Sequence, residues 1–369
     1  MELLRADPGS EEVSDRPWRA AWSADAEANA ALVARHLPAH VDHRTSGSGG
    51  DPVTWRRTAA QLWAEAGLLA DLLRPHRPQA VLSFAPPRHV FGTLATLLVP
   101  ARLGVPVWYR PRLTDANPPG GSLRWAVMAI PWTFSLLRPR SAWLGETADL
   151  TFLHSTARLP AAAADLVGAL GPDRARVIEV LGSTETGGVA SRRWEPEPPP
   201  WRLLDDTSFS WEGDDGRERR LEVASPRMAA RPGRDAPDRW RMDDHVTRTG
   251  EREFVLTGRR ERLVKVNGRR VCLDTVEERL RPALDCADLG AVPVTHDTIG
   301  EHYELYVVPR PGQDLTPAGV AAVAAELGPR PHRVRVVERV DRSPTGKTLR
   351  RQSAPPSSPS HPRLRSTHP

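Results

Sequence analysis

The chain has 369 residues, 39% of them hydrophobic and 26% charged, which is enough for two globular domains with a sizeable core. A net charge of +5 and a pI near 9.8 could reflect a nucleic-acid partner. The arginines alternate with Asp and Glu, however, and form no basic block with interleaved aromatic residues, so nucleic-acid binding is disfavoured. The two cysteines, Cys272 and Cys286, exclude a disulfide framework and a four-cysteine zinc site.

The N-terminal residues predict no export signal. The stretch MELLRADPGSEEVSDRP is mixed in charge and has no apolar centre, unlike a signal peptide. The longest apolar runs, at residues 90–101 and 125–137, are too short to span a bilayer. We therefore expect no membrane span and a reducing, cytoplasmic location.

The first 40 residues are charged, with helix-like stretches, and His36, His40 and His43 lie close together in the sequence. A metal site there is disfavoured because Pro38 interrupts the helical face that would align His36 with His40. Apolar residues at helical spacing then predict a helix at 55–74. The following elements alternate in the manner of parallel βαβ units: a strand at 80–85, a helix at 89–104, strands at 105–109 and 148–155, a helix at 160–170 and a strand at 176–183.

The remainder of the first domain is expected to be antiparallel. A Pro- and Trp-rich surface connection at 195–206 precedes predicted strands at 219–225 and 253–258. The predicted fold class is thus α/β: a large N-terminal α/β domain with a mostly parallel sheet, followed by a small, mobile C-terminal α+β domain.

The texture of the sequence changes at about residue 262. Asn267-Gly268, between ERLVKV and RRVCL, predicts a β-hairpin. Asp274 with Glu277 predicts the N-cap of a helix, and Thr316 caps a later helix at 316–327. The Pro/Ser-rich tail after residue 351 is expected to be disordered.

Two short stretches carry residues suited to phosphate chemistry. TSGSGGDP (45–52) can turn several backbone N–H groups toward one anion, although Ser/Gly runs are also typical of linkers. EVLGSTETGG (179–188) ends a predicted buried strand with Ser183, Thr184 and Glu185, at the sheet edge where α/β proteins bind ligands. Hydroxyls there can meet a phosphate and the carboxylate can hold Mg²⁺, while an ordinary polar turn is the alternative.

The use of lysine is a further signal. Among 51 basic residues, Lys265 and Lys347 are the two lysines and all others are arginines. Lysine is a compact charge on a flexible stem, whereas arginine is a rigid fork. The two lysines lie in VLTGRRERLVKVNGRRV and SPTGKTLRR, which could otherwise be a surface hairpin and a tail.

Together these stretches resemble the adenylate-forming (AMP-binding) superfamily, which includes acyl- and aryl-CoA synthetases, peptide-synthetase adenylation domains and luciferases. The resemblance also involves PPRHVFG (86–92), HSTARLP (154–160) and RWRMDDHV (239–246). It extends from residue 44 to about 351 with the motifs in the family's order, and both lysines fall where it expects lysine. TSGSGGDPVTWRRTAAQLWAEA is most similar to compact acyl synthetases of fatty-acid or polyene pathways.

The resemblance implies roles for individual residues. Lys347 would bridge the incoming carboxylate and the phosphate, Thr184 would reach the α-phosphate, and Glu185 would hold Mg²⁺. His89 and Gly92 would lie on the substrate side. The implied nucleotide-binding residues are Thr45, Ser46, Gly47, Ser48, Gly49, Gly50, Gly182, Ser183, and the ribose-binding pair Asp244 and Arg259.

It also implies the domain organisation. An AMP-binding core at 1–257 would be joined by a hinge at 258–261 to a lid at 262–351, with a tail at 352–369. The lid would pivot near Glu261 and offer Lys265 and Gly268 to the incoming thiol. The implied function is ATP- and Mg²⁺-dependent activation of a small carboxylic acid as an acyl adenylate. Transfer to CoA, or to the phosphopantetheinyl arm of an acyl or peptidyl carrier protein, would follow.

The sequence departs from the family at several positions. Val53 stands where the phosphate loop usually has lysine, Gly49 replaces a hydroxyl residue, and Leu181 replaces the aromatic residue expected against adenine. Asp243 stands where glycine is usual, and Glu261 replaces the hinge aspartate. The phosphate loop also begins early, as if the usual N-terminal subdomain were missing. A degenerate, catalytically weak nucleotide- or acyl-binding member is therefore the alternative. Core packing is favoured over a substrate pocket for Trp125, Trp132, Phe134 and Trp143.

Overall fold

The computed structural model describes residues 2–45, 53–112, 118, 121–137, 140–155, 159–213, 216–259, 262–266, 269–296, 300–342 and 348–349. The chain forms two compact units, and the division falls between residues 260 and 261. Each unit has its own hydrophobic core, as independently packed domains do. The predicted tail at 352–369 lies outside the described residues.

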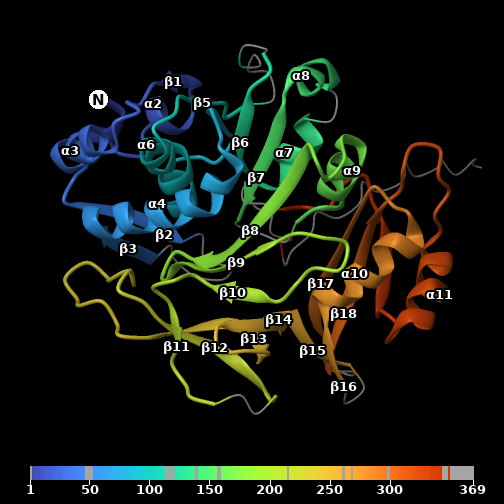
Figure 1. Ribbon diagram of the computed structural model, residues 1–369. Coiled ribbons are helices and arrows are strands. Elements are labelled where there is room, and N and C mark those ends of the chain that lie inside the picture. The colour runs from blue at the N-terminus through green and yellow to red at the C-terminus, as the bar shows by residue number, and fades with distance from the viewer. Residues whose placement is uncertain are drawn as a thin grey trace, which may run out of the picture. The chain divides into compact units, whose positions relative to one another are not determined.

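The first unit is built on a twelve-stranded sheet with the order β1-β5-β4-β6-β7-β8-β9-β10-β14-β13-β12-β11 (Figure 1). In its first half, β5, β4, β6, β7 and β8 are parallel neighbours, and β1 pairs antiparallel with β5 at the edge. Continuous apolar sequences such as AVLS suit parallel strands that are buried on both faces. These strands are β1 (Trp18–Ala20), β4 (Ala80–Ser83), β5 (Val107–Tyr109), β6 (Arg124–Ala129), β7 (Asp149–His154) and β8 (Ala175–Ser183).

The second half of the same sheet is antiparallel. The α/β class is confirmed, but the sheet is mixed rather than mostly parallel. The reason is loop length: β8 and β9 are joined by Thr184, Glu185 and Thr186, whereas a parallel partner needs a crossover of a dozen or so residues. The strands are β9 (Gly187–Arg193), β10 (Trp201–Leu203), β11 (Ser208–Phe209), β12 (Glu218–Ala224), β13 (Trp240–Arg248) and β14 (Glu253–Arg259).

The helix predicted at 55–74 begins later in the structure than the sequence indicated. The stretch 55–74 begins as strand β3 (Val53–Thr58), which pairs with β2 (His40–Thr45), and continues as helix α4 (Ala59–Leu73). Thr58 caps α4 with Gln61 in a capping box, a signature that the T-x-x-Q sequence carries. The others are α1 (Glu2–Arg5), α2 (Glu11–Ser14), α3 (Ala26–His36), η1 (Arg74–His76), α5 (Val90–Gly92), η2 (Thr93–Leu98), α6 (Val99–Leu103), α7 (Pro131–Leu137), α8 (Ser141–Glu146) and α9 (Ala161–Leu170).

The large aromatic residues of the first unit pack in its core. Trp125, Phe134 and Trp143 are buried, and Trp132 packs beside them. Trp125 lies edge-on to Trp143, with ring centroids 5.5 Å apart, in the tilted geometry that aromatic pairs prefer. The predicted core role of these four residues is confirmed.

The second unit contains a hairpin, a three-stranded sheet and two helices. Strands β15 (Leu263–Val266) and β16 (Arg269–Cys272) pair antiparallel around Asn267-Gly268, as predicted, although these two residues lie outside the described ones. The sheet has the order β17-β18-β19, and Thr316 caps α11 by accepting from the Gly319 N–H. The remaining elements are α10 (Leu273–Leu284), β17 (Asp288–His296), β18 (Gly300–Val308), α11 (Pro317–Leu327) and β19 (Arg333–Val336).

The predicted N-cap at Asp274 is wrong. Helix α10 begins at Leu273, with Cys272 at the cap position. The carboxylates of Asp274 and Glu277 instead both accept from the Arg262 guanidinium, and Glu277 also accepts from the Ala291 N–H at 2.7 Å. The acidic pair thus fastens the start of the unit to β17 rather than capping the helix.

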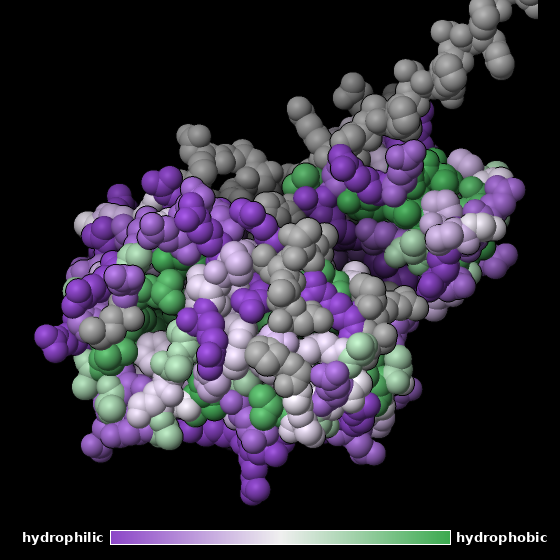
Figure 2. Space-filling model, turned by 90° about the horizontal axis from the view of Figure 1, so that it is seen from above, coloured by the Kyte–Doolittle hydropathy of each residue, from purple (hydrophilic) through white to green (hydrophobic). Residues whose placement is uncertain are grey.

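On the side seen in Figure 2, hydrophilic side chains are spread among apolar ones. The large hydrophobic side chains that are exposed among the described residues are Val255, Leu327 and Leu349. Within that part of the chain, no helix is long and apolar enough to cross a membrane.

We predict that limited trypsin digestion cuts preferentially near the division between the units. Arg259, Arg260 and Arg262 offer cleavage sites there, and few contacts cross a boundary between compact units. Mass spectrometry should find an early pair of fragments with ends in 259–262. Early cleavage confined to other arginines, with this junction intact, would contradict the predicted hinge at 258–261.

Candidate active site

The Ser183–Thr184–Glu185 segment lies where β8 ends and the chain turns back into β9. Gly182 and Gly187 make this turn possible: a Cβ on Gly182 would lie 2.2 Å from the Gly187 carbonyl oxygen, and Gly187 has a φ of +71°, which favours glycine. The Thr186 hydroxyl donates to the Gly187 carbonyl at 2.8 Å and accepts from the Ser183 N–H at 3.2 Å. The turn therefore projects from the carboxyl end of the last parallel strand, where α/β sheets bind ligands.

The backbone of this turn is held by two other segments. The Glu185 carbonyl accepts from the Ala229 N–H at 2.8 Å. The Thr184 carbonyl accepts from Nη2 of Arg57 at 3.4 Å. The Thr184 and Glu185 side chains are half-buried. Both can therefore contact a ligand while the backbone that carries them is held in place.

The Gly-rich stretch joins two strands of a hairpin. Thr45, the last residue of β2, pairs with Val53, the first residue of β3. Residues 46–52, with Ser46, Gly47, Ser48, Gly49 and Gly50 among them, lie outside the described residues, so their predicted contacts stay predictions. Farther along β3, Arg56 and Ala230 exchange backbone hydrogen bonds of 2.7 and 2.9 Å. Because Ala229 binds Glu185, the hairpin and the turn share one supporting segment.

The predicted ribose-binding residues are cross-strand neighbours. In the backbone register, Asp244 on β13 directly opposes Arg259 on β14. The Asp244 side chain is buried. The preceding Asp243, where the family usually has glycine, accepts instead from Nη2 of Arg220 on β12 at 2.8 Å. Asp243, which stands where the family usually has glycine, thus forms an ion pair at the surface.

The substrate-side segment is also rigidly built. A Cβ on Gly92 would lie 1.8 Å from the Pro86 carbonyl oxygen, so glycine is required for close packing there. The helix that follows has a π-helical stretch, η2, a form found often at functional sites. Thr93 and Thr96 on η2 donate to the carbonyls of Pro87 and Ala85 at 2.6 and 2.7 Å. His89 precedes α5, and burial, followed by the charge of Arg88, lowers its pKa.

His43 joins the hairpin to this segment, a contact that the sequence did not predict. Its Nε2 lies 2.9 Å from the Thr93 hydroxyl oxygen. Because that hydroxyl already donates to Pro87, Nε2 carries the proton and donates. Burial, followed by the charge of Arg57, lowers the pKa of His43 to about 4, so the ring is neutral at pH 7. His36 instead accepts from Nε of Arg5, and among the described residues no group of three metal-ligating side chains is found.

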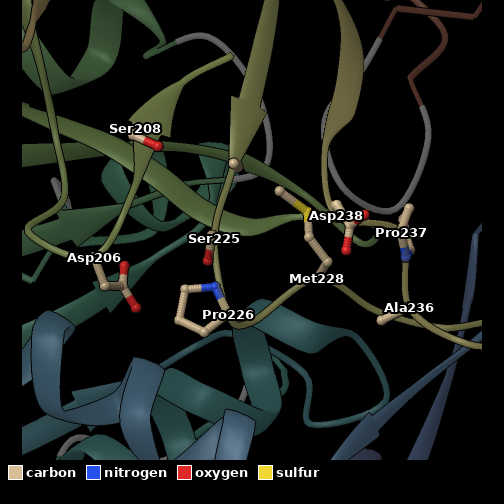
Figure 3. A pocket seen from close by; sticks show the side chains of 9 residues that line it. Asp206, Ser208, Ser225, Pro226, Met228, Ala236, Pro237 and Asp238 are labelled. Atoms are coloured by element: carbon tan, nitrogen blue, oxygen red, sulfur yellow. The ribbon is translucent and has the colours of Figure 1, made fainter.

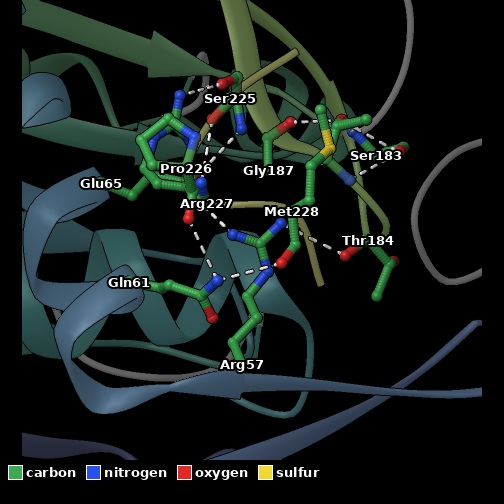
Figure 4. A network of polar contacts seen from close by, with 12 residues as sticks. Arg57, Gln61, Glu65, Ser183, Thr184, Gly187, Ser225, Pro226, Arg227 and Met228 are labelled. Atoms are coloured by element: carbon green, nitrogen blue, oxygen red, sulfur yellow. Dashed lines mark hydrogen bonds and ion pairs between the residues drawn. The ribbon is translucent and has the colours of Figure 1, made fainter. Parts of the chain in front are cut away.

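A buried charge network lies beneath the turn, and it was also missed (Figure 4). The Glu65 carboxylate on α4 accepts from Nη1 of Arg57 at 2.7 Å and from the Gly188 N–H at 2.6 Å. It also pairs with Nη1 of Arg227 at 3.0 Å. The side chains of Arg57, Glu65 and Arg227 are each 1% exposed. A charged residue on the apolar face of 59–73, between Leu62 and Leu69, was the sequence signal that could have revealed it.

The rest of the network reaches Asp206. Nε and Nη2 of Arg227 donate to the two oxygens of Asp206 at 2.6 and 2.8 Å, the bidentate geometry that makes such pairs strong. Nη2 also donates to the Gly188 carbonyl at 2.9 Å. The four side chains therefore carry two positive and two negative charges, and the network is balanced.

A pocket of about 420 Å³ lies next to the segment that carries Arg227 (Figure 3). Its lining includes Asp206, Ser225, Pro226 and Met228. The predicted residues Thr184, Glu185 and Asp244 are not part of it, so this pocket is not the predicted nucleotide site. Leu181, expected to face adenine, is buried in a core cluster with Val189 and Trp201.

Several predicted residues could not be placed. Lys347, Glu261 and Gly268 lie outside the described residues. Lys265 opposes Arg270 on the hairpin of the second unit, and Arg259 is described through its backbone alone. The roles assigned to these residues remain predictions.

Comparison with known proteins gives consistent similarities. A 4-coumarate–CoA ligase of Rhodobacter capsulatus is 30% identical over 256 residues, 68% of this chain and 59% of that protein. One from Cereibacter sphaeroides is 27% identical over 243 residues, 64% of this chain and 52% of that protein. The chain thus spans a little over half the length of these curated relatives. No family model matches the sequence.

Solved structures share the fold. ATP-bound MatB from Rhodopseudomonas palustris has a TM-score of 0.67 at 19% identity, covering 84% of this chain and 66% of that one. A benzoate CoA ligase from Burkholderia xenovorans gives 0.67 at 18% identity over 84% and 67%. An AMP-acid ligase II-like protein from Dyadobacter fermentans gives 0.50 at 17% identity, but is covered over 97% of its length. The chain belongs to the adenylate-forming superfamily, with acyl-CoA synthetases among its relatives.

We predict that Glu65→Ala destabilises the first unit by about 3–5 kcal/mol, because it leaves two buried guanidiniums without their shared carboxylate. Urea unfolding followed by tryptophan fluorescence reports on this unit alone, since all 12 tryptophans precede residue 241. Glu11→Ala is the control: it breaks the Glu11–Arg16 pair, whose side chains are 68% and 63% exposed, and should cost less than about 1 kcal/mol. Equal effects of the two changes would contradict the network's importance.

We predict that His43 makes the first unit less stable in acid. Its pKa is about 4 in the folded state and near 6.5 when unfolded, so between these values the unfolded chain binds more protons. Stability is therefore full above pH 6.5 and falls as the pH drops toward 4, by up to about 3 kcal/mol. The variant His43→Gln keeps a donor for Thr93 and should flatten this part of the pH profile. A profile identical to that of the wild type would rule out His43 as the cause.

Proposed function

We propose that this protein uses ATP to activate a carboxylic acid as an acyl adenylate and then transfers the acyl group to a thiol. One observation carries the proposal: the Thr184–Glu185 turn projects from the carboxyl end of β8, and β3, the strand that follows the Gly-rich stretch, is joined to it by backbone hydrogen bonds from Arg56 to Ala230 and from Ala229 to Glu185. A Gly-rich sequence that can turn N–H groups toward an anion, together with a hydroxyl and a carboxylate at a strand end, suits a triphosphate. The CoA ligase names of the curated relatives support the same reaction class.

In the first step, an oxygen of the acid attacks the α-phosphorus of ATP. An oxygen–phosphorus bond forms, the bond to the β-phosphate oxygen breaks, and pyrophosphate leaves. The enzyme supplies no nucleophile, so catalysis depends on orientation and on charge compensation. Thr184 would donate to an α-phosphate oxygen, and Asp244 would accept from the ribose hydroxyls beside Arg259. Lys347 would lie between the carboxylate and the phosphate.

Glu185 is the residue proposed to hold Mg²⁺. The ion keeps several waters and is bound by one or two carboxylates together with substrate phosphates, so a single half-buried carboxylate at a strand end fits. When bound, the ion would neutralise phosphate charge. The contacts on the carbonyls of Thr184 and Glu185 hold the backbone from which this carboxylate extends.

The second step needs a thiol acceptor. The thiol would attack the acyl carbonyl carbon, and AMP would leave. CoA is favoured by the names of the relatives, and a phosphopantetheinyl carrier protein offers the same thiol arm. Lys265 and Gly268 are proposed to line the acceptor side of the second unit.

A catalytically weak nucleotide- or acyl-binding protein is the second candidate. It is favoured by Val53, which opens β3 opposite Thr45 and puts an apolar side chain where the resemblance expects a phosphate-binding lysine. An ATP–pyrophosphate exchange screen separates the two candidates. The panel should include 4-coumarate, benzoate and straight-chain fatty acids. Exchange with any acid supports the ligase, whereas ATP binding by calorimetry without exchange supports the binding protein.

We predict that Lys347→Ala abolishes exchange with an accepted acid and leaves ATP binding nearly intact, because its loss falls on the chemical step. Lys347→Arg should also fail, since a guanidinium cannot replace a compact charge between two oxygens. Lys265→Ala is the matched control in the other lysine and should spare exchange. Full activity of Lys347→Arg would refute the catalytic role of this lysine.

A further inference from the structure

We infer that Arg57, Glu65 and Arg227 are positioning residues for Thr184 and Glu185: they fix the backbone of the turn from its buried side and so set the direction of the two reactive side chains. The inference rests on the proposed function, because it assigns the network to the adenylation step. None of the three side chains would touch the nucleotide, since each is 1% exposed.

The contacts of the network converge on the turn and its return strand. Arg57 donates to the Thr184 carbonyl at 3.4 Å. Gly188 is held at both backbone groups, with its N–H on Glu65 at 2.6 Å and its carbonyl on Arg227 at 2.9 Å. A Cβ on Gly187 would lie 2.2 Å from the Glu65 carboxylate, so the strand passes directly over it. The turn is therefore held at its start and just after its end by one connected group.

The same group also holds the segments on either side of the turn. Arg57 lies on β3, the strand that leaves the Gly-rich loop, and its neighbour Arg56 pairs with Ala230. Gln61, one helical turn before Glu65, donates to the carbonyls of Pro226 and Met228 at 3.2 and 3.0 Å, as Figure 4 shows. Arg57 is the side chain that joins this strand directly to the Thr184 carbonyl. It acts beside the backbone hydrogen bonds that lead from Arg56 to Ala230 and from Ala229 to Glu185.

Stabilising the core alone would not require buried charged side chains. Apolar side chains of similar volume often stabilise a core as well as a buried ion group does, whereas directional contacts select one geometry. One directional contact on the turn and two on the strand that follows it suit accurate placement of a reacting group, because misplacement by about 1 Å can cost about 10²-fold in rate.

The test uses Arg57→Lys in the full chain. Lysine keeps the charge balance but cannot bind Glu65 and the Thr184 carbonyl together, because it lacks the guanidinium fork. Arg176→Lys is the matched control: Arg176 pairs with Asp149 at the opposite end of β8, with side chains 11% and 16% exposed. For ATP–pyrophosphate exchange, we would measure kcat, the KM for ATP and the Mg²⁺ concentration that gives the half-maximal rate. Glu185→Gln is the reference for a disturbed metal requirement. Thermal unfolding confirms that each variant is folded.

The expected result is a loss of about tenfold or more in kcat for Arg57→Lys, with a raised Mg²⁺ requirement and a nearly unchanged KM for ATP. Arg176→Lys should match the wild type. Hydrogen exchange of the peptide that contains residues 183–188 should be severalfold faster in Arg57→Lys than in Arg176→Lys. If wild-type exchange activity is absent, the proposed function fails, and this second measurement still decides on the positioning role.

Two outcomes would overturn the inference. One is a folded Arg57→Lys variant with wild-type kcat and Mg²⁺ requirement. The other is unchanged hydrogen exchange at residues 183–188. If Arg57→Lys does not fold, Arg227→Lys takes its place, since lysine there cannot keep Asp206, Glu65 and the Gly188 carbonyl as partners. Unaltered protection of the turn in that variant would likewise reject the positioning role.

Discussion

The placement of several segments of the first unit depends on one buried group, the carboxylate of Glu65. Two arginines and one backbone N–H converge on it away from water, and buried charges must stay paired. This condition determines where neighbouring segments can lie. Helix α4 must begin at the place that brings Glu65 under the turn, and Thr58 and Gln61 fix that start through the capping box. Gly187 must lack a side chain because the carboxylate occupies its space.

A second group of buried contacts holds the segment that was predicted to lie on the substrate side. His43 binds Thr93, Thr93 binds the Pro87 carbonyl, and Thr96 binds the Ala85 carbonyl. This group is neutral, in contrast to the ionic group around Glu65, because burial keeps His43 uncharged. Strands β2 and β3 of the Gly-rich hairpin contribute one residue to each group, His43 and Arg57. The hairpin is therefore held through an uncharged contact on one strand and an ionic contact on the other.

Short-range patterns in the sequence predicted much of this arrangement. The apolar runs predicted β4, β5, β7 and β8 but missed the central strand β6. The residues between Leu181 and Gly188 predicted the turn at the end of β8. The helix at 55–74 was misjudged because Trp55 and Arg57 fit a helical face as well as a strand, and only pairing with β2 decides between them. Asp274 was misjudged because its partner, Arg262, lies outside the local cap motif. Glu65, Arg57 and Arg227 could not be matched as partners, since 162 residues separate Glu65 from Arg227 and one-dimensional periodicity carries no information on such contacts.

The position of β1 in the sheet means that two neighbouring strands become available at different times during synthesis. Trp18 of β1 pairs with Tyr109 of β5, and Ser14 accepts from the Tyr109 hydroxyl through its carbonyl and from the Arg88 N–H through its side chain. During synthesis from the N-terminus, β1 is therefore made before its partner β5, which follows β4 and the helices up to α6. Until β1 docks, β5 presents an open strand edge, which is a template for pairing with another nascent chain. In the folded chain, β1 covers this edge of β5 along the three residue pairs from Trp18–Tyr109 to Ala20–Val107.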